Sequence, residues 1–575
     1  MASKMVVDRD VPITMDDGVV LRADVYRPAS GQHPVLMTYG PYGKGVPWRD
    51  AYRLSWQAMV AQHPDMLPGS SREYMVWETP DPETWVPWGY VCVRVDSRGA
   101  GRSPGHLDIW APRESRDYYA CIEWAAAQPW CTGKVGLSGI SYYAANQWMV
   151  ASLQPPHLAA MVPWEGFADS YRDQARHGGI LSNDFVDVWF PRQIVSVQHG
   201  NPHTITDPWL GERASGPATL SDAERAQNRS DAGQDRLRRP LDGDWYRARS
   251  ADWARVTVPF LSCASWAGYG LHPRGNFEAF TQAASTQKWL SCHPGKHEEW
   301  YYLPEGVNLQ KRFLDHFLKG IDNGWDREPA VIMRERRPFS HEFPVRHETA
   351  WPLLKTAWTK LYFGAAEDGS SPALAWDPSG ASATTSFAAL DAGITLLSAP
   401  LENDVEITGP LAAKIFASSS TTDMDLFVTL QAFSPDGREV DFQGTVDPHT
   451  PLAQGWLRAS HRKLDASKTL PYRPYHSHDE IQPLAPGTTY ELDVEIWPTH
   501  IILPAGYRLA LHIGGKDFER PATPGEAQGA WKSRGSGPFL HTHPLDRPAD
   551  VYGGTSTIYY GGKTPSFLLL PIIKA

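Results

Sequence analysis

The stretch from Lys134 to Trp148, KVGLSGISYYAANQW, decides the fold. A short strand runs into Gly139–Tyr142 and then into a helix whose first turn carries Ala144 and Ala145. Glycine permits a sharp turn at this point, and the small alanines let the strand and the helix approach each other. A serine in such a turn is held exposed at the end of its strand. The stretch therefore predicts a nucleophile elbow with Ser141 at its tip.

Two features of the stretch leave alternatives open. Tyr143 stands where the pattern G-x-S-x-G has its last glycine, and Ser138 is a second serine three residues before Ser141. Ser138 lacks the strand-then-helix placement that exposes a side chain above a sheet, so Ser141 is preferred. Ser141 could instead cap the helix N-terminus, as serine often does.

Composition excludes several classes of protein. The 575 residues exceed what one hydrophobic core supports, so several domains are expected. A net charge of -11 argues against nucleic acid as a partner. Because the N-terminus is charged and no long apolar run follows, we expect a cytoplasmic protein without a membrane partner. Five scattered cysteines with no C-x-x-C pair support neither disulfides nor zinc, and no metal or cofactor is indicated.

The first half of the chain alternates short apolar runs with segments of helical periodicity. Such alternation is typical of a mostly parallel sheet covered by helices on both faces. Before it, residues 11–26 alternate apolar and polar side chains around Asp16-Asp17-Gly18, which predicts an antiparallel hairpin. The runs predicted as strands are Pro34 to Thr38, Tyr90 to Val95, Lys134 to Leu137, Leu158 to Pro163, Pro259 to Cys263 and Lys288 to Cys292.

Two further regions complete the expected organisation. Between residues 166 and 250 the sequence becomes polar and favours helices, which predicts a helical cap inserted into the α/β part. From about Thr356 onward, alternating runs broken by Gly, Pro and Asp predict an all-β jelly roll. The predicted domains are 1–165 and 251–352 for the α/β core, 166–250 for the cap, and 353–575 for the tail.

The ordered motifs resemble the cocaine esterase and X-prolyl dipeptidyl-peptidase family of α/β-hydrolases over nearly the whole chain. In the core and in the tail they are Gly40-Pro-Tyr42, Asp96-Ser-Arg-Gly99, Gly139-Ile-Ser-Tyr142, Thr422 to Leu430, Ser434-Pro-Asp-Gly437, Ala459 to Arg462 and Pro504 to Leu509. The resemblance implies cleavage of a small ester or amide through an acyl-enzyme on Ser141. It also implies an oxyanion hole built from the Tyr142 N–H and the Tyr42 hydroxyl, which would stabilise the developing negative charge.

The base is expected after the last strand of the core, in the sequence WLSCHPGKHEE. His297 matches the position of the family's base in this loop, and His293 is the second choice. His272, in the preceding segment GLHPRG, is expected to be structural or to face the substrate.

The acid is where the sequence departs from the family. The usual aspartate should follow Trp266, but SWAGYG contains no carboxylate. Glu165, just after the strand that precedes the cap, is the predicted acid, because that strand presents its end on the same side of the sheet. Asp169 is the second candidate, and a third interpretation leaves His297 without any carboxylate.

Trp164 and Trp266 end the two strands beside the expected site and predict an aromatic substrate pocket. The main functional hypothesis is a serine esterase. An amidase or X-prolyl-type aminopeptidase with the same nucleophile is one alternative, and a binding protein whose triad has decayed is another, motivated by the missing aspartate and the missing elbow glycine. A homo-oligomer is compatible with the sequence.

Overall fold

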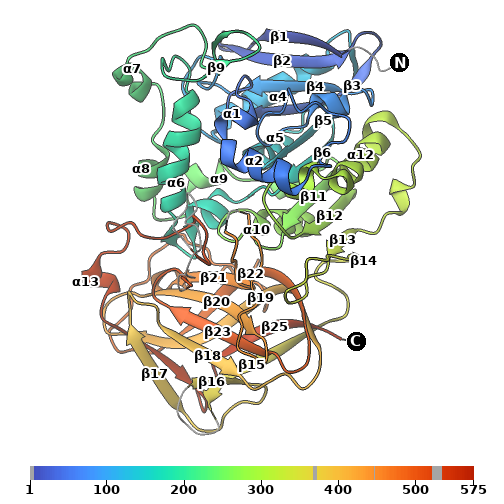
Figure 1. Cartoon of the computed structure of the whole chain (residues 1–575). Coiled ribbons are helices and arrows are strands. Elements are labelled where there is room, and N and C mark those ends of the chain that lie inside the picture. The colour runs from blue at the N-terminus through green and yellow to red at the C-terminus, as the bar shows by residue number, and fades with distance from the viewer. Residues whose placement is uncertain (1–4, 367–371, 446, 521–533, 575) are drawn as a thin grey trace.

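The chain folds around two large β-sheets that occupy separate parts of the molecule (Figure 1). The computed structural model describes residues 5–366, 372–445, 447–520 and 534–574. The first sheet and its helices form the blue to yellow-green part of Figure 1, and the second sheet forms the yellow-to-red part below it. None of the helices in these ranges combines the length and the apolar character needed to cross a membrane.

The first sheet has ten strands in the order β1-β2-β4-β3-β5-β6-β11-β12-β13-β14. In the same order, the ten strands span Met5–Thr14, Val20–Pro28, Val91–Asp96, His33–Gly40, Cys131–Ile140, Leu158–Trp164, Phe260–Ser265, Lys288–His293, Val331–Arg334 and Val345–Glu348. Neighbours from β4 to β13 are parallel. The six apolar runs predicted as strands are six of these, and the predicted hairpin is β1 with β2. Both predictions are confirmed.

Helices cover both faces of this sheet, as the alternating pattern predicts. Helices α4, α5 and α10 pack with side chains such as Val35 and Met37 on one face, and α12 packs with Leu36 and Val162 on the other. The bounds are α4 Pro112–Ala126, α5 Tyr142–Ala151, α10 Pro273–Gln282, α11 Glu299–Tyr302 and α12 Pro304–Lys319. Three more helices, α1 Trp48–Ala51, α2 Arg53–Gln62 and α3 Pro82–Trp85, lie between β3 and β4 in the sequence.

The segment between β6 and β11, which the sequence predicts as a helical cap, is built from short elements rather than long helices. It contains four short α-helices, α6 Asp184–Trp189, α7 Asp222–Gln227, α8 Ala232–Leu237 and α9 Asp244–Arg247. Two-residue strands and irregular helical turns fill the rest: η1 Ser170–Ala175, β7 Arg176–His177, β8 Ile180–Leu181, η2 Phe190–Ile194, η3 Val195–Val197, β9 Thr206–Asp207 and β10 Glu212–Arg213. In Figure 1 the labelled cap helices lie along one side of the first sheet.

The tail is all-β, as predicted, apart from short helical turns such as α13 Ala549–Tyr552. Its strands are β15 Thr356–Ala365, β16 Pro372–Ala375, β17 Ala383–Ala388, β18 Ile394–Ser398, β19 Val405–Ser419, β20 Asp425–Phe433, β21 Ala453–Arg458, β22 Tyr490–Leu503, β23 Arg508–Gly514, β24 Thr555–Tyr560 and β25 Phe567–Ile573. Strand β25 pairs with both β15 and β19, so this sheet closes on itself around a large apolar core.

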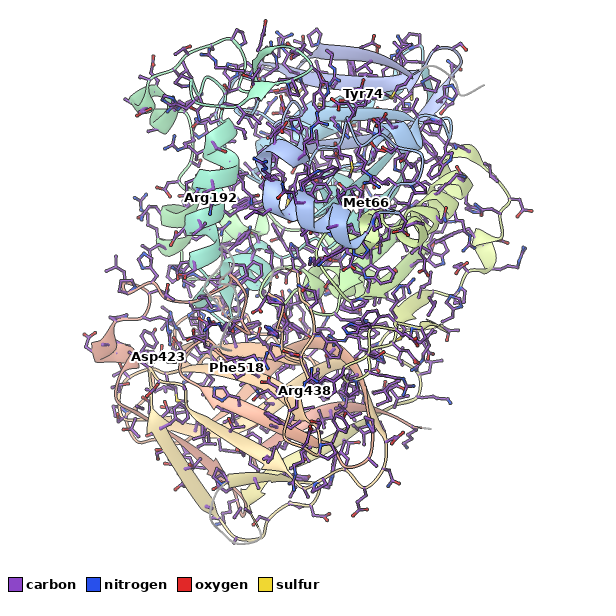
Figure 2. All side chains as sticks on the ribbon, viewed as in Figure 1. Met66, Tyr74, Arg192, Asp423, Arg438 and Phe518 are labelled. Carbon is purple, nitrogen blue, oxygen red and sulfur yellow. The ribbon has the colours of Figure 1, made fainter. Side chains whose placement is uncertain are left out.

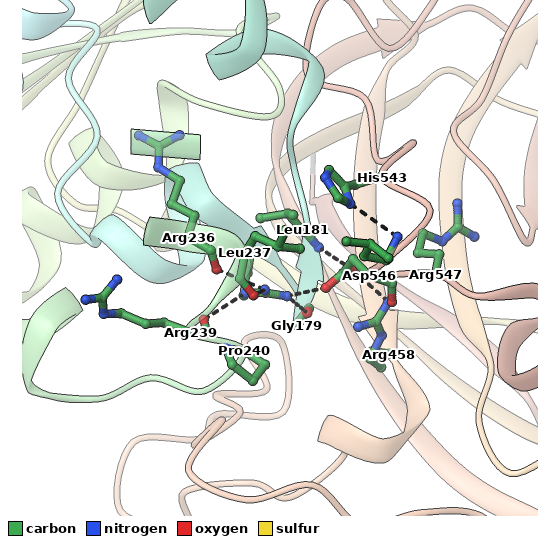
Figure 3. A network of polar contacts seen from close by, with 12 residues as sticks. Gly179, Leu181, Arg236, Leu237, Arg239, Pro240, Arg458, His543, Asp546 and Arg547 are labelled. Atoms are coloured by element: carbon green, nitrogen blue, oxygen red, sulfur yellow. Dashed lines mark hydrogen bonds and ion pairs between the residues drawn. The ribbon is translucent and has the colours of Figure 1, made fainter. Parts of the chain in front are cut away.

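Side chains fill the zone between the two parts (Figure 2). A buried ion-pair network ties the cap to the tail there (Figure 3). Asp546 of the tail pairs with Arg176 of the cap at 2.7 Å and with Arg458 of β21 at 3.0 Å. The Arg176 guanidinium also donates to the carbonyl oxygens of Arg236 and Arg239 in the cap. The tail therefore contacts the cap through buried charges that are paired with each other.

Candidate active site

Ser141 lies directly between β5 and α5, with φ of 57° and ψ of -109°. Its backbone N–H donates to the carbonyl oxygen of Trp164 at 2.9 Å, which ties the turn to the end of β6. Ser141 occupies the N-cap position of α5, but its side chain makes no capping hydrogen bond to the helix. The hydroxyl is free to make contacts above the sheet instead.

The missing elbow glycine is explained by glycines on the strand side of the turn. A Cβ on Gly139 would lie 2.5 Å from the Tyr143 Cβ, and one on Gly40 would lie 2.6 Å from the Tyr143 ring. Tyr143 therefore occupies space that two glycines leave open. The elbow keeps its close packing of strand against helix, although the small residues stand at other positions than in G-x-S-x-G.

Ser138 is not available for catalysis at this turn. It lies within β5 and is fully buried. Its Oγ is 2.8 Å from the hydroxyl of Tyr301 and donates to the side-chain oxygen of Gln310 at 3.3 Å. The preference for Ser141 over Ser138 therefore agrees with their surroundings.

The imidazole that touches the Ser141 hydroxyl belongs to His272, at the N-terminus of α10. Ser141 Oγ and His272 Nε2 are 3.2 Å apart, and His272 Nδ1 lies 3.7 Å from Glu165 Oε2. Burial, and after it the charge on His297, lower the pKa of His272 to about 3. The ring is therefore neutral at pH 7, and one of its nitrogens can accept a proton. The sequence placed His272 near the site only as a structural or substrate-facing residue.

Glu165 follows β6, and its carboxylate contacts more than one histidine of the site. Its Oε1 is 2.9 Å from His293 Nε2, and its Oε2 is 2.7 Å from His297 Nδ1. Burial alone would raise the pKa of Glu165, but the charge of His297 and hydrogen bonds from both histidines outweigh burial and lower that pKa to about 2. The carboxylate is therefore ionised at neutral pH, as the acid of a triad must be.

His297 lies between two carboxylates rather than against Ser141. Besides its bond to Glu165, its Nε2 is 2.9 Å from Glu78 Oε1. Burial acts to lower the pKa of His297, but Glu165 and Glu78 outweigh it and raise the pKa to about 10. In this arrangement His297 is an imidazolium whose two nitrogens are both engaged. Its predicted role as base stays a prediction.

Glu78 is a site residue that the sequence did not indicate, because it lies in an irregular loop before α3 with no recognisable motif. Its carbonyl oxygen accepts from the Ile140 N–H at 3.1 Å, which fixes it beside the elbow. Burial raises the pKa of Glu78, although the hydrogen bond and charge of His297 oppose that shift. Glu298, also buried, acts on Glu78 in the same direction as burial.

The two residues expected to form an oxyanion hole lie side by side. The rings of Tyr42 and Tyr142 have centroids 5.8 Å apart. Tyr42 OH accepts a hydrogen bond from Trp189 Nε1 of the cap at 3.2 Å, and burial followed by the charge of Glu78 raises the pKa of Tyr42 well above its ordinary value. The Tyr42 hydroxyl therefore stays protonated and can donate a hydrogen bond. Among the described residues, no hydrogen bond uses the backbone N–H of Tyr142.

The other predicted residues lie around the site without touching Ser141 Oγ. Asp169 caps the turn that begins at Ser170 and pairs with Arg172, so its carboxylate is already occupied. Trp266 packs in a core cluster with Phe277 and Trp351, whereas the Trp164 ring packs on His293. Trp164 and His293 also line a cavity of about 280 Å³ beside α12.

One group of the described residues offers atoms that a metal ion could use. Glu165, His272 and His297 each present a ligand atom, and these atoms all lie within 4.8 Å of one another. A carboxylate that faces an imidazolium already has its charge compensated, so the cluster is explained without an ion.

Family models match most of the chain. Residues 17–299 match the model described as X-Pro dipeptidyl-peptidase (S15 family), and residues 323–568 match the model described as the X-Pro dipeptidyl-peptidase C-terminal non-catalytic domain. The first match covers most of the α/β part, and the second covers the last two strands of the first sheet and most of the all-β tail. The resemblance inferred from the motifs is confirmed.

Individual relatives agree with these matches. The chain is 24% identical over 594 residues to a putative serine esterase of Mycobacterium bovis, covering 88% of this chain and 90% of that protein. It is also 24% identical over 655 residues to the cocaine esterase of a Rhodococcus species, covering 99% of both chains. A crystal structure of a CocE/NonD family hydrolase from Staphylococcus aureus is 32% identical, with a TM-score of 0.83 and coverage of 99% of this chain and 94% of that one.

Proposed function

Because the chain belongs to the CocE/NonD family of hydrolases, we propose that it cleaves a carboxylic ester through an acyl-enzyme on Ser141. The observation that carries the proposal is the elbow itself. Ser141 Oγ is free of the helix it precedes and lies 3.2 Å from an imidazole nitrogen. A hydroxyl placed against a neutral imidazole can give up its proton as it attacks a carbonyl.

The first proton transfer is assigned to His272, the imidazole in contact with Ser141 Oγ. His272 takes the proton during attack and returns it to the leaving alcohol, and a water then repeats the cycle to release the acid. Glu165, 3.7 Å from His272 Nδ1, compensates the charge of the imidazolium that forms. The Tyr42 hydroxyl and the Tyr142 N–H are the proposed donors to the tetrahedral oxyanion.

His297, the base expected from the sequence, stands as the alternative. It would need to exchange its Nε2 contact with Glu78 for one with Ser141, since that nitrogen now faces Glu78 Oε1 at 2.9 Å. Loss of the Glu78 contact would also lower the pKa of His297 toward the range in which an imidazole works as a base.

An aminopeptidase activity is the second candidate. It is favoured by two buried acidic side chains, Glu78, which is tied to the elbow through the Ile140 N–H, and Glu298, whose charge acts on Glu78, since a carboxylate pair attracts a free amino group. Paired p-nitrophenyl substrates that differ only in an α-amino group separate the candidates. An esterase with no preference for an α-amino group should cleave both substrates. An aminopeptidase should cleave only the substrate that carries the amino group.

The primary test is p-nitrophenyl ester hydrolysis together with fluorophosphonate labelling and mass spectrometry. Wild type should turn over and carry the label on Ser141, whereas Ser141→Ala should do neither and should keep its unfolding transition. Absence of both turnover and label from folded wild type would contradict the proposal and favour the decayed binding protein.

The small-molecule substrate, the cytoplasmic location and a homo-oligomeric state belong to the same proposal. Cell fractionation tests the location, and sedimentation of the purified chain tests the oligomeric state.

A further inference from the structure

We propose that Thr445, in the all-β tail, is a positioning residue for Glu165, so that the tail completes the active site. This inference rests on the proposed role of Glu165 as the triad acid. It assigns a part in catalysis to a region whose family description calls it non-catalytic.

Thr445 touches the acid and one of the histidines at the same time. Its Oγ1 donates to Glu165 Oε2 at 3.3 Å, and its carbonyl oxygen accepts from the backbone N–H of His297 at 3.5 Å. An ionised carboxylate can only accept, so the threonine hydroxyl must be the donor. One residue of the tail therefore holds both ends of the Glu165–His297 pair.

Two glycines allow the tail to come this close to the core. A Cβ on Gly268 would lie 2.9 Å from Thr445 Oγ1, and a Cβ on Gly444 would lie 2.6 Å from the carbonyl oxygen of Ala267. Both distances are shorter than ordinary carbon contacts. The approach of Thr445 thus depends on the absence of side chains on either side of the contact.

The loop that carries Thr445 is braced within the tail. Asp447 Oδ2 accepts from the backbone N–H groups of Gly535 and Gly537, at 2.5 and 3.2 Å. The segment that contains Gly535 and Gly537 also carries Phe539. The ring centroids of Phe539 and His272 are 6.4 Å apart, and the Phe539 side chain packs against Gly270. The tail accordingly contacts both the acid and the loop of the proposed base.

The hydroxyl fixes a carboxylate oxygen that must serve two imidazoles. Glu165 Oε2 accepts from His297 Nδ1 at 2.7 Å and faces His272 Nδ1 at 3.7 Å, while Oε1 is held by His293. Without the Thr445 bond, Oε2 would lose one of the donors that set its direction. Because Thr445 touches neither the nucleophile nor the proposed oxyanion donors, its loss should slow turnover and leave substrate affinity unchanged.

The test compares Thr445→Val, which is nearly isosteric but lacks the hydroxyl, with Thr445→Ser, which keeps it. We expect Thr445→Val to lose about tenfold in kcat, the effect of one hydrogen bond to a charged group, with KM within about twofold. Thr445→Ser should recover most of the loss, and fluorophosphonate labelling of Ser141 should slow in parallel with kcat. Thr445→Ala provides a second hydroxyl-free variant should valine not be accommodated.

Thr408→Val is the matched control. The Thr408 hydroxyl likewise donates to a glutamate, Glu406, inside the tail. Thr408→Val should keep kcat, and all variants should keep the unfolding transition of wild type. Unchanged kcat in Thr445→Val, an equal loss in Thr445→Ser, or an equal loss in Thr408→Val would each overturn the inference.

Failure of the inference is distinguishable from failure of the proposed function. A fully active Glu165→Gln variant would remove Glu165 as the acid, and the role of Thr445 with it. A damaged Glu165→Gln beside a fully active Thr445→Val would overturn the Thr445 inference alone.

Discussion

The imidazole rings of His272 and His297 lie nearly parallel, with centroids 4.6 Å apart and planes inclined by 24°. The two rings differ in charge, because burial and the charge on His297 lower the pKa of His272 to about 3 while Glu165 and Glu78, against the effect of burial, raise that of His297 to about 10. At neutral pH the site thus pairs one neutral and one cationic imidazole.

This division of roles predicts unequal effects of two matched substitutions. His272→Gln should lower kcat a hundredfold or more, because it removes the imidazole in contact with Ser141 Oγ. His297→Gln should cost less, about tenfold, because it removes only the cation that holds Glu165. Steady-state kinetics with a p-nitrophenyl ester measures both. The reverse order of effects would establish His297 as the base.

The acid is tested by Glu165→Gln, which keeps the shape of the side chain but removes its charge. We expect kcat to fall by about a hundredfold or more, since the imidazolium formed during attack loses its compensation. The pH dependence of kcat should shift as well, because the charge that raises the pKa of His297 is gone. Activity within a few-fold of wild type would contradict this role.

Tyr42→Phe tests the oxyanion donor. Removal of one such hydroxyl should lower kcat by about a hundredfold while KM changes little, because the bond to the oxygen strengthens only in the transition state. Tyr118→Phe is the control, since the Tyr118 hydroxyl donates to the Met37 carbonyl inside the core. Equal kinetics for the two variants would exclude Tyr42 from the hole.

The docking of the tail is tested at Asp546. Asp546→Asn should lower the free energy of unfolding by about 3 kcal/mol, because Arg176 would be left buried without its anion and Arg458 would keep only its pair with Asp425. Denaturant unfolding measures the loss. Asp222→Asn is the control, since the Asp222 side chain is itself 92% exposed where it pairs with Arg225, so its loss should change stability by less than about 0.5 kcal/mol.

The pairing of His297 with Glu165 predicts a stability window in pH. The pKa of His297 is raised from 6.5 to about 10, so its contribution is fully present below pH 6.5 and is lost as the pH rises toward 10. The pKa of Glu165 is lowered from 4.5 to about 2, so its contribution is present above pH 4.5 and is lost as the pH falls toward 2. The difference in unfolding free energy between wild type and His297→Gln should therefore be largest between pH 4.5 and 6.5. A difference that is constant from pH 5 to 10 would contradict the pairing.

Much of the architecture was predictable because it follows from local patterns. A buried parallel strand such as β6 coincides with a short apolar run, and the glycine turn at Gly139 indicates the elbow. Side-chain periodicity also separates the α/β part from the tail. The short elements of the cap were less predictable, because they depend on contacts with the rest of the molecule.

The residues of the site also fall into those that local sequence patterns predict and those that depend on contacts in the folded molecule. The sequence by itself determined Ser141 as the residue of the elbow and Glu165 as the carboxylate at the next strand end, since the carboxyl ends of neighbouring parallel strands meet at one edge of a sheet. Only the tertiary structure decided that His272 faces Ser141, that His297 lies between Glu165 and Glu78, and that Thr445 reaches Glu165 from the tail. These contacts join residues that lie 131, 219 and 280 positions apart in the chain. No local pattern encodes such distances, because they are set by how the loops and the two sheets pack together.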